Sequence, residues 1–239
     1  MYKIKLILQL LLVSGFMLLL QADETGKAGR IVGGKRAMIE TIPYIVQLRN
    51  LTELFCGGTL VKPTFVISAA HCFDTPILRH NFKVVGGVSG ASDEGISVGA
   101  VKVNVPVKYN KETKDANFAI ITLVSSLDGP NIDIVPLCSH QWKVGDQLEI
   151  SGWGTSEWEK HSSILRKTSV EIISHEDCVQ KYEAQHMAIT PKMICAFVAG
   201  ENDQCGRDAG GPAILNGELC GVVSFGVSCA DEEIPSVYG

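Results

Sequence analysis

The sequence lacks several features that would place it in other classes of protein. It has no low-complexity tract and no internal repeat of solenoid length, which argues against a repeat architecture. It contains no Cys-x-x-Cys pair, so no zinc site of that kind is expected. Charged residues make up only 20% of the chain, and 26 acidic against 21 basic residues give a net charge of −5. This mild acidity argues against a nucleic-acid partner. We therefore predict no metal and no cofactor, and neither nucleic acid nor a membrane as a partner.

The sequence does contain enough apolar residues, 46% of 239, for one large fold or two small ones. From residue 41 onward the hydrophobic pattern has a period of two, which is typical of half-buried strands. The clearest alternation is at 101–107, where valine takes every second position. Many short strands separated by turn residues indicate an all-β barrel or sandwich. The predicted strands are 42–48, 82–85, 101–107, 117–123, 147–150, 170–173, 213–215 and 218–220.

Two local signals are more specific. Asn216-Gly217 favours the positive φ angles of a type I′ hairpin turn between the last two predicted strands. Ser174, followed three residues later by Asp177, resembles a capping box that opens a short helix through Tyr182.

The first 22 residues have the layout of a secretory signal peptide. Residues 1–5 carry two lysines, 6–20 are almost wholly apolar, and Ala22 precedes a charged segment. The alternative is an uncleaved membrane anchor, but the apolar run is shorter than the span of about 20 residues that a bilayer requires and contains Gln9 and Ser14. We predict that the mature protein is secreted.

The eight cysteines agree with export, because an even number behind a signal peptide favours an oxidised framework. Their spacing alone leaves the connectivity open. Asn50 begins the one Asn-x-Ser/Thr sequon of the chain, so it is the predicted glycosylation site.

Four motifs show a resemblance to a known family. Residues 203–212 read Asp-Gln-Cys-Gly-Arg-Asp-Ala-Gly-Gly-Pro, 68–72 read Ser-Ala-Ala-His-Cys, 151–154 read Ser-Gly-Trp-Gly, and 30–34 read Arg-Ile-Val-Gly-Gly. Together they resemble the chymotrypsin/trypsin family of serine peptidases, from residue 30 to 238. The resemblance implies two six-stranded antiparallel Greek-key barrels, at about 31–137 and 138–239. Because the family continues through a last strand and a C-terminal helix, we expect both to be missing and interpret the chain as a fragment or an incomplete gene model.

The resemblance places the family's catalytic triad at His71, Asn117 and Ala209. His71 keeps the general base, but an alanine methyl group has no lone pair to attack a carbonyl, so the covalent chemistry of this loop is absent. Residues 115–121 read Asp-Ala-Asn-Phe-Ala-Ile-Ile and resemble the family segment that carries the orienting aspartate. Asn117 replaces that aspartate, a change that costs about 10⁴ in turnover in this family. Asp115 lies before the strand begins, so we do not expect it to substitute. Arg207 replaces the glycine of the oxyanion hole, whose two donors fall on residues 207 and 209.

The residues that match the substrate-binding site are less altered. Asp203 matches the aspartate at the base of the trypsin specificity pocket, where a carboxylate favours arginine or lysine. Ser224 and Gly226 match the segment that pairs with substrate backbone. Ser236 stands where the pocket wall normally has glycine, and Gln204 is bulkier than the usual residue. The alternative is a partly filled pocket that binds nothing.

The resemblance also implies an activation switch and a disulfide pattern. Residues 23–30 form a short propeptide, and cleavage after Arg30 would free the Ile31 amine to pair with Asp208. The alternative is that Arg30 is an ordinary loop residue. The family pattern implies three disulfides, and the two cysteines left over give a fourth. The implied pairs are Cys56–Cys72, Cys178–Cys195, Cys205–Cys229 and Cys138–Cys220.

We therefore interpret the chain as a secreted serine protease homologue without peptidase activity. It would act by binding proteins or peptides: active proteases, their substrates or their inhibitors. One alternative is an active endopeptidase that cleaves after Arg or Lys through an unrecognised nucleophile such as Ser224. The other is a decayed product without function.

Overall fold

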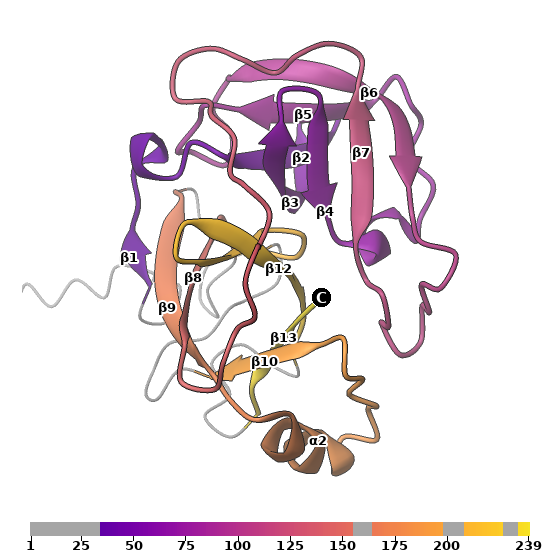
Figure 1. Cartoon of the computed structure of the whole chain (residues 1–239). Helices are drawn as coiled ribbons and strands as arrows, with labels where there is room; N and C mark the ends of the chain where they lie inside the picture. Colours follow the sequence, from indigo (N-terminus) through magenta and orange to yellow (C-terminus); the bar gives the residue numbers. More distant parts are fainter. Residues whose placement is uncertain (1–33, 155–163, 198–207, 227–233) are drawn as a thin grey trace, which may run out of the picture.

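The computed structural model describes residues 34–154, 164–197, 208–226 and 234–239, and these residues form two β-barrels (Figure 1). The first barrel, coloured indigo to magenta, lies above the second, coloured orange to yellow. None of the helices within the described residues is long and apolar enough to cross a membrane.

The first barrel is a closed ring of six antiparallel strands in the order β2-β3-β4-β7-β6-β5. Pairing of β5 with β2 completes the ring. Two short 3-10 helices, η1 (Ile39–Thr41) and η2 (Ala70–Phe73), precede β2 and follow β4. The strands are β2 (Ile45–Asn50), β3 (Glu53–Lys62), β4 (Phe65–Ser68), β5 (Phe82–Gly86), β6 (Ile96–Asn104) and β7 (Ala119–Leu123).

The second barrel repeats the same order of strands. Its ring runs β8-β9-β10-β13-β12-β11, and pairing of β11 with β8 closes it. Counted from its own first strand, each barrel therefore has the order 1-2-3-6-5-4. A short strand, β1 (Lys35–Arg36), pairs with β9 outside the ring. The strands are β8 (Gln147–Gly152), β9 (Arg166–Ile172), β10 (Ile194–Phe197), β11 (Pro212–Leu215), β12 (Glu218–Phe225) and β13 (Ser236–Tyr238).

The prediction of two six-stranded antiparallel barrels is confirmed, but the expected loss of the terminal strand is wrong. Residues 236–238 form β13, which pairs with β10 on one side and β12 on the other. Three residues suffice because all three are buried and both neighbouring strands satisfy their backbone groups. The open barrel edge that a missing strand would leave is therefore not present.

The run at 101–107 corrects a second expectation. The strand there is Ile96–Asn104, and its register shifts between Ala100 and Lys102. The residue inserted at this bulge is Val101, which is 47% exposed, whereas Val107 lies beyond the end of the strand and is fully exposed. A regular sequence pattern does not produce burial where the backbone inserts an extra residue.

The two local signals are confirmed. Asn216 and Gly217 both have positive φ angles, 51° and 80°, in the turn between β11 and β12. The single α-helix within the described ranges, α2 (His175–Glu183), begins after Ser174, whose hydroxyl accepts a hydrogen bond from the Asp177 backbone N–H at 3.0 Å. Tyr182 is buried and its hydroxyl donates to the Pro235 carbonyl at 2.6 Å, which anchors the helix beside β13.

Each barrel has its own apolar core, and shared clusters join the two. Ile45 from the first barrel packs in one cluster with Trp153 from the second. Ile67 and Ile214 belong to another cluster that also draws on both barrels. Figure 1 shows the segment between β7 and β8 running from the first barrel down along the second. These contacts hold the two barrels together.

Among the cysteines that the structure describes, three disulfides are formed, at the pairs Cys56–Cys72, Cys138–Cys220 and Cys178–Cys195. The second of them ties the segment between the barrels to β12. The predicted pair Cys205–Cys229 lies outside the described residues. Asn50 is exposed at the end of β2, so a glycan there, which stays a prediction, would meet no packed surface.

Candidate active site

The predicted triad positions come from both barrels and meet where the barrels face each other. His71 lies in η2, directly after β4, and Asn117 lies just before β7, which pairs with β4. Ser224, on β12 of the second barrel, contacts Asn117. Ala209 lies in the turn that leads into β11. The fold therefore brings together residues that are up to 153 positions apart in the sequence (71 to 224).

Asn117 is the centre of this arrangement and is completely buried. Its Oδ1 accepts a hydrogen bond from the backbone N–H of His71 at 2.9 Å. Its Nδ2 lies 2.8 Å from Nδ1 of the same histidine and 2.6 Å from the hydroxyl oxygen of Ser224. All three contacts of the amide are therefore made to two residues.

These contacts decide which nitrogen of His71 carries the proton. A backbone N–H can only donate, so the oxygen of the Asn117 amide must face it and the NH₂ group must face the ring. Because an amide NH₂ can only donate, Nδ1 of His71 accepts, and the proton of the neutral ring resides on Nε2. Burial lowers the pKa of His71 below its usual value. The imidazole is thus held neutral, with its outer nitrogen a donor rather than a base.

The turn that carries Ala209 is built tightly against the first barrel. The Ala209 carbonyl accepts from the backbone N–H of Gly57 at 2.9 Å, and the N–H of Gly210 donates to the carbonyl of Val223 at 2.9 Å. Gly210 has a φ of +82°, and a Cβ there would overlap the hydroxyl of Ser68. The turn needs glycine at 210 for both reasons. The turn fixes the backbone of Ala209, whose side chain offers only a methyl group.

Asp208, next to Ala209, is a fully buried carboxyl group. Its Oδ1 accepts a hydrogen bond from the backbone N–H of Gly154 at 2.7 Å. Desolvation by burial raises the pKa of Asp208 to about 7, partly offset by that hydrogen bond. A Cβ on Gly152 would overlap the same carboxyl oxygen, so the Ser-Gly-Trp-Gly motif leaves space for this side chain. Ile31 and Arg30 lie outside the described residues, so the ion pair with Asp208 stays a prediction.

Comparisons with known proteins agree with this architecture. The trypsin family model matches residues 31–239. The chain belongs to the trypsin family. It is 32% identical to seminase of Drosophila melanogaster over 87% of this chain and 77% of the relative. It is 35% identical to a trypsin of Sus scrofa over 87% of this chain and 90% of the relative. Human trypsin-3 is also 35% identical, over 87% of this chain and 68% of its own length.

In trypsin-family terms, the structure describes part of the predicted substrate site. Ser224 is 5% exposed, and its hydroxyl oxygen accepts a hydrogen bond from Nδ2 of Asn117 at 2.6 Å. Gly226 follows the end of β12, and the Ser236 hydroxyl would lie 3.6 Å from a Cβ on it. The side chain at 236 therefore faces the wall beside Gly226. Asp203 and Arg207 lie outside the described residues.

Two groups of polar residues near the triad were not found from the sequence. Asp115, which is not expected to replace the orienting carboxylate, instead binds Thr190 at 2.7 Å and Lys192 at 2.6 Å, both ahead of β10 in the second barrel. The hydrogen bond with Lys192 lowers the pKa of Asp115. Asp74, one turn after His71, accepts from the Tyr109 hydroxyl at 3.1 Å. No local pattern links these residues, because their partners are between 35 and 77 positions away.

Two clusters have ligand atoms close enough for a metal ion, but neither has the chemistry for one. Cys138 and Cys220 lie with His140 and Glu218, and Cys56 and Cys72 lie with His71. In both clusters the two cysteines form a disulfide, so no thiolate is available. In the part of the chain that the structure describes, these clusters are therefore disulfide sites.

Proposed function

We propose that this trypsin-family chain has no peptidase activity and acts as a secreted binding or regulatory protein in extracellular proteolysis. The observation that carries the proposal is the pair of substituted triad positions, Asn117 and Ala209, on an otherwise intact scaffold. The Asn117 amide holds His71 in the tautomer that cannot accept a proton at Nε2. The methyl group of Ala209 has neither a lone pair nor a proton to exchange with that ring.

Either change alone is large enough to abolish ordinary turnover. Replacing the orienting aspartate by asparagine costs about 10⁴ in this family. Removing the nucleophile costs about 10⁶ on the unrelated subtilisin scaffold, and the two losses do not add because the triad acts as a unit. The substitutions stand 92 positions apart (117 to 209), and Arg207 makes a third departure, which argues against one isolated exchange.

The features that support binding are the retained ones. Both barrels close, the turn around Ala209 keeps its backbone hydrogen bonds, and Asp208 is buried beside Gly154. We expect a freed Ile31 amine to pair with this carboxyl group. Cleavage after Arg30 would then act as a conformational switch rather than as the activation of an enzyme. Partners of this kind of surface are active proteases, their substrates or their inhibitors.

Secretion is supported by the predicted signal peptide at 1–22 and by the disulfides. Three disulfides are stable in an oxidising compartment and rare in the cytosol. Glycosylation at Asn50 belongs to the same proposal.

The second candidate is an active endopeptidase that cleaves after Arg or Lys, and the names of the relatives, several of them trypsins, favour it. It requires a nucleophile other than residue 209. Ser224 is the hydroxyl nearest the triad, but it is 5% exposed and hydrogen-bonded to Asn117 at 2.6 Å, on the side of His71 away from Nε2. That position does not direct it at a substrate carbonyl.

A series of back-substitutions tests the proposal. Protein cleaved after Arg30 is treated with a serine-reactive fluorophosphonate and assayed on arginyl and lysyl amides. We expect no labelling of the natural chain, slow labelling of Ala209→Ser, and labelling about 10⁴ faster when Asn117→Asp is added. Asn117→Asp alone is the matched control and stays unlabelled. Labelling of the natural chain at any serine, or amide hydrolysis at ordinary rates with contaminating protease excluded, would show that the chain is an enzyme.

A further inference from the structure

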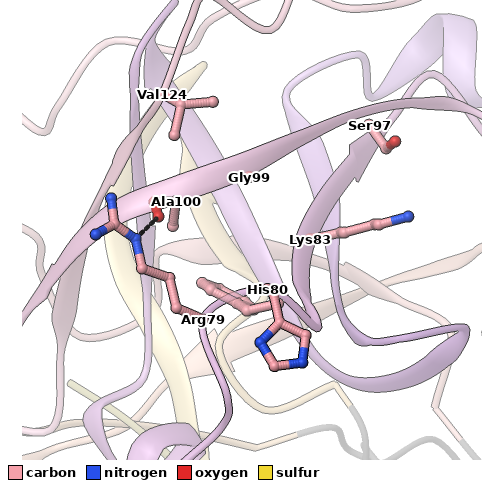
Figure 2. Close-up of a pocket in the computed structure, with 8 residues that line it drawn as sticks. Arg79, His80, Lys83, Ser97, Gly99, Ala100 and Val124 are labelled. Atoms are coloured by element: carbon pink, nitrogen blue, oxygen red, sulfur yellow. Dashed lines mark hydrogen bonds between the residues drawn. The ribbon is translucent and has the colours of Figure 1, made fainter.

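A groove on the first barrel lies apart from the triad positions. It forms where the residues before β5 and the start of that strand, 79–83, pass beside β6 (Figure 2). Its volume is about 480 Å³. None of the residues that line it is a triad, oxyanion, activation or predicted substrate-binding residue. Its chemistry therefore needs its own explanation.

The rim of this groove is positively charged on a protein that is negatively charged overall. Arg79, His80 and Lys83 line it, and no aspartate or glutamate does, although the whole chain carries a net charge of −5. Figure 2 shows these three side chains arranged along β6, below Gly99 and Ala100. In the described part of the chain, the side chains of His80 and Lys83 make no hydrogen bond or ion pair with the protein itself. The ammonium of Lys83 and the ring nitrogens of His80 are available to a partner.

Arg79 is oriented for recognition. Its Nε donates a hydrogen bond to the backbone carbonyl of Ala100 at 3.1 Å, which is drawn as a dashed line in Figure 2. This contact fixes the plane of the guanidinium and leaves the two terminal nitrogens without a partner among the described residues. A guanidinium with that edge open binds a carboxylate through two parallel hydrogen bonds.

The floor of the groove is apolar. Phe82 and Ala100 are buried beneath it, and Val124, which is 58% exposed, forms one side. Gly99 keeps the middle open, because a Cβ built on it would have no atom within 4 Å. The groove can therefore receive an apolar side chain between its charged groups.

We propose that this groove binds an acidic peptide segment of a partner protein, with a carboxylate on Arg79, a second on Lys83 and an apolar side chain over Gly99. A sulfated polysaccharide would satisfy the charges but has no side chain for the floor of Phe82, Ala100 and Val124. The apolar floor therefore favours a peptide. The volume suits a few side chains only, so the contact is one part of a larger interface. This inference goes beyond the proposed function and holds whether or not the chain hydrolyses peptides.

The test uses the purified full chain and a short fluorescent peptide in which glutamate alternates with leucine, followed by fluorescence anisotropy. We expect binding at about 0.1 M salt that weakens strongly toward about 1 M, because the Debye length falls from about 10 Å to about 3 Å over this range.

Arg79→Glu with Lys83→Glu is expected to weaken binding at least about tenfold, because both side chains would then repel the peptide carboxylates that they attract in the natural chain. Gly99→Leu is expected to block the groove to a similar extent, and its Cβ would meet no atom within 4 Å. Lys83→Glu alone is expected to weaken binding as well, and Lys108→Glu, which makes the same change of charge at an exposed lysine outside the groove, is its matched control and binds normally.

Other outcomes would overturn the inference. Equal weakening by Lys108→Glu would show a non-specific charge effect, and undiminished binding by Gly99→Leu would place the peptide elsewhere. A peptide with glutamine in place of glutamate must not bind. Binding of a sulfated oligosaccharide without binding of the peptide would assign the groove to a different class of partner. Near-ultraviolet circular dichroism of each variant shows that a loss reflects the groove and not the fold.

Discussion

The buried carboxyl of Asp208 should make the stability of the chain depend on pH and on cleavage after Arg30. In the folded protein the pKa of Asp208 is raised to about 7, against 3.8 for an exposed aspartate. The folded state therefore binds this proton more tightly than the unfolded state does. The contribution to stability is complete below about pH 4 and is lost as the pH rises through about 7.

The magnitude follows from the difference between these pKa values. A difference of about three units, at about 1.4 kcal/mol per unit, corresponds to about 4 kcal/mol. That is a large part of the total stability of a domain, which is about 5–15 kcal/mol. In the uncleaved chain we expect the free energy of unfolding to fall by this order between about pH 4 and about pH 7. After cleavage at Arg30, a Ile31 ammonium beside the carboxylate should hold it ionised and remove most of the decline.

Urea unfolding followed by the fluorescence of buried Trp153 measures this quantity in both forms across the same pH range. Asp208→Asn is the control, because the amide keeps an oxygen for the Gly154 N–H but does not titrate. The uncleaved variant should show a flatter pH dependence than the uncleaved natural chain. If the natural chain and Asp208→Asn have the same slope before cleavage, or if cleavage leaves the slope unchanged, the reasoning about this pocket is wrong.

Three further predictions concern stability. Gly152→Ala places a methyl group against the buried carboxyl of Asp208 and should lower the free energy of unfolding by about 1–3 kcal/mol, measured by urea denaturation. An unchanged urea midpoint would refute the close packing. Replacing Cys138 and Cys220 together by alanine removes a disulfide that spans 82 residues and should lower the free energy of unfolding by about 4 kcal/mol, because the unfolded chain gains loop entropy. The shift in thermal midpoint against the natural chain, under oxidising conditions, measures this loss. Ser174→Ala removes the N-cap of α2 and should cost about 1 kcal/mol, whereas Ser174→Asp, which can still cap, should restore most of it.

Much of this protein could be predicted from local sequence. Period-two hydrophobic patterns indicated most of the strands, and Asn216-Gly217 and Ser174 marked a turn and a helix start, because these signals depend on neighbouring residues only. The triad positions His71, Asn117 and Ala209 were assigned from short motifs. Such motifs are read from adjacent residues, so this assignment did not require the fold.

Only the tertiary structure decided the rest. The bulge after Ala100 exposed Val101, and the strand ended at Asn104, before the last two valines of the pattern. Backbone partners on both sides made three residues at 236–238 a sufficient sixth strand. The direction of the Asn117 amide, and with it the proton on His71, depends on a backbone N–H 46 positions away. The raised pKa of Asp208 depends on the absence of water around it. Hydrogen-bond direction and desolvation arise from atoms that the chain brings together from distant positions, so no pattern along the sequence contains them.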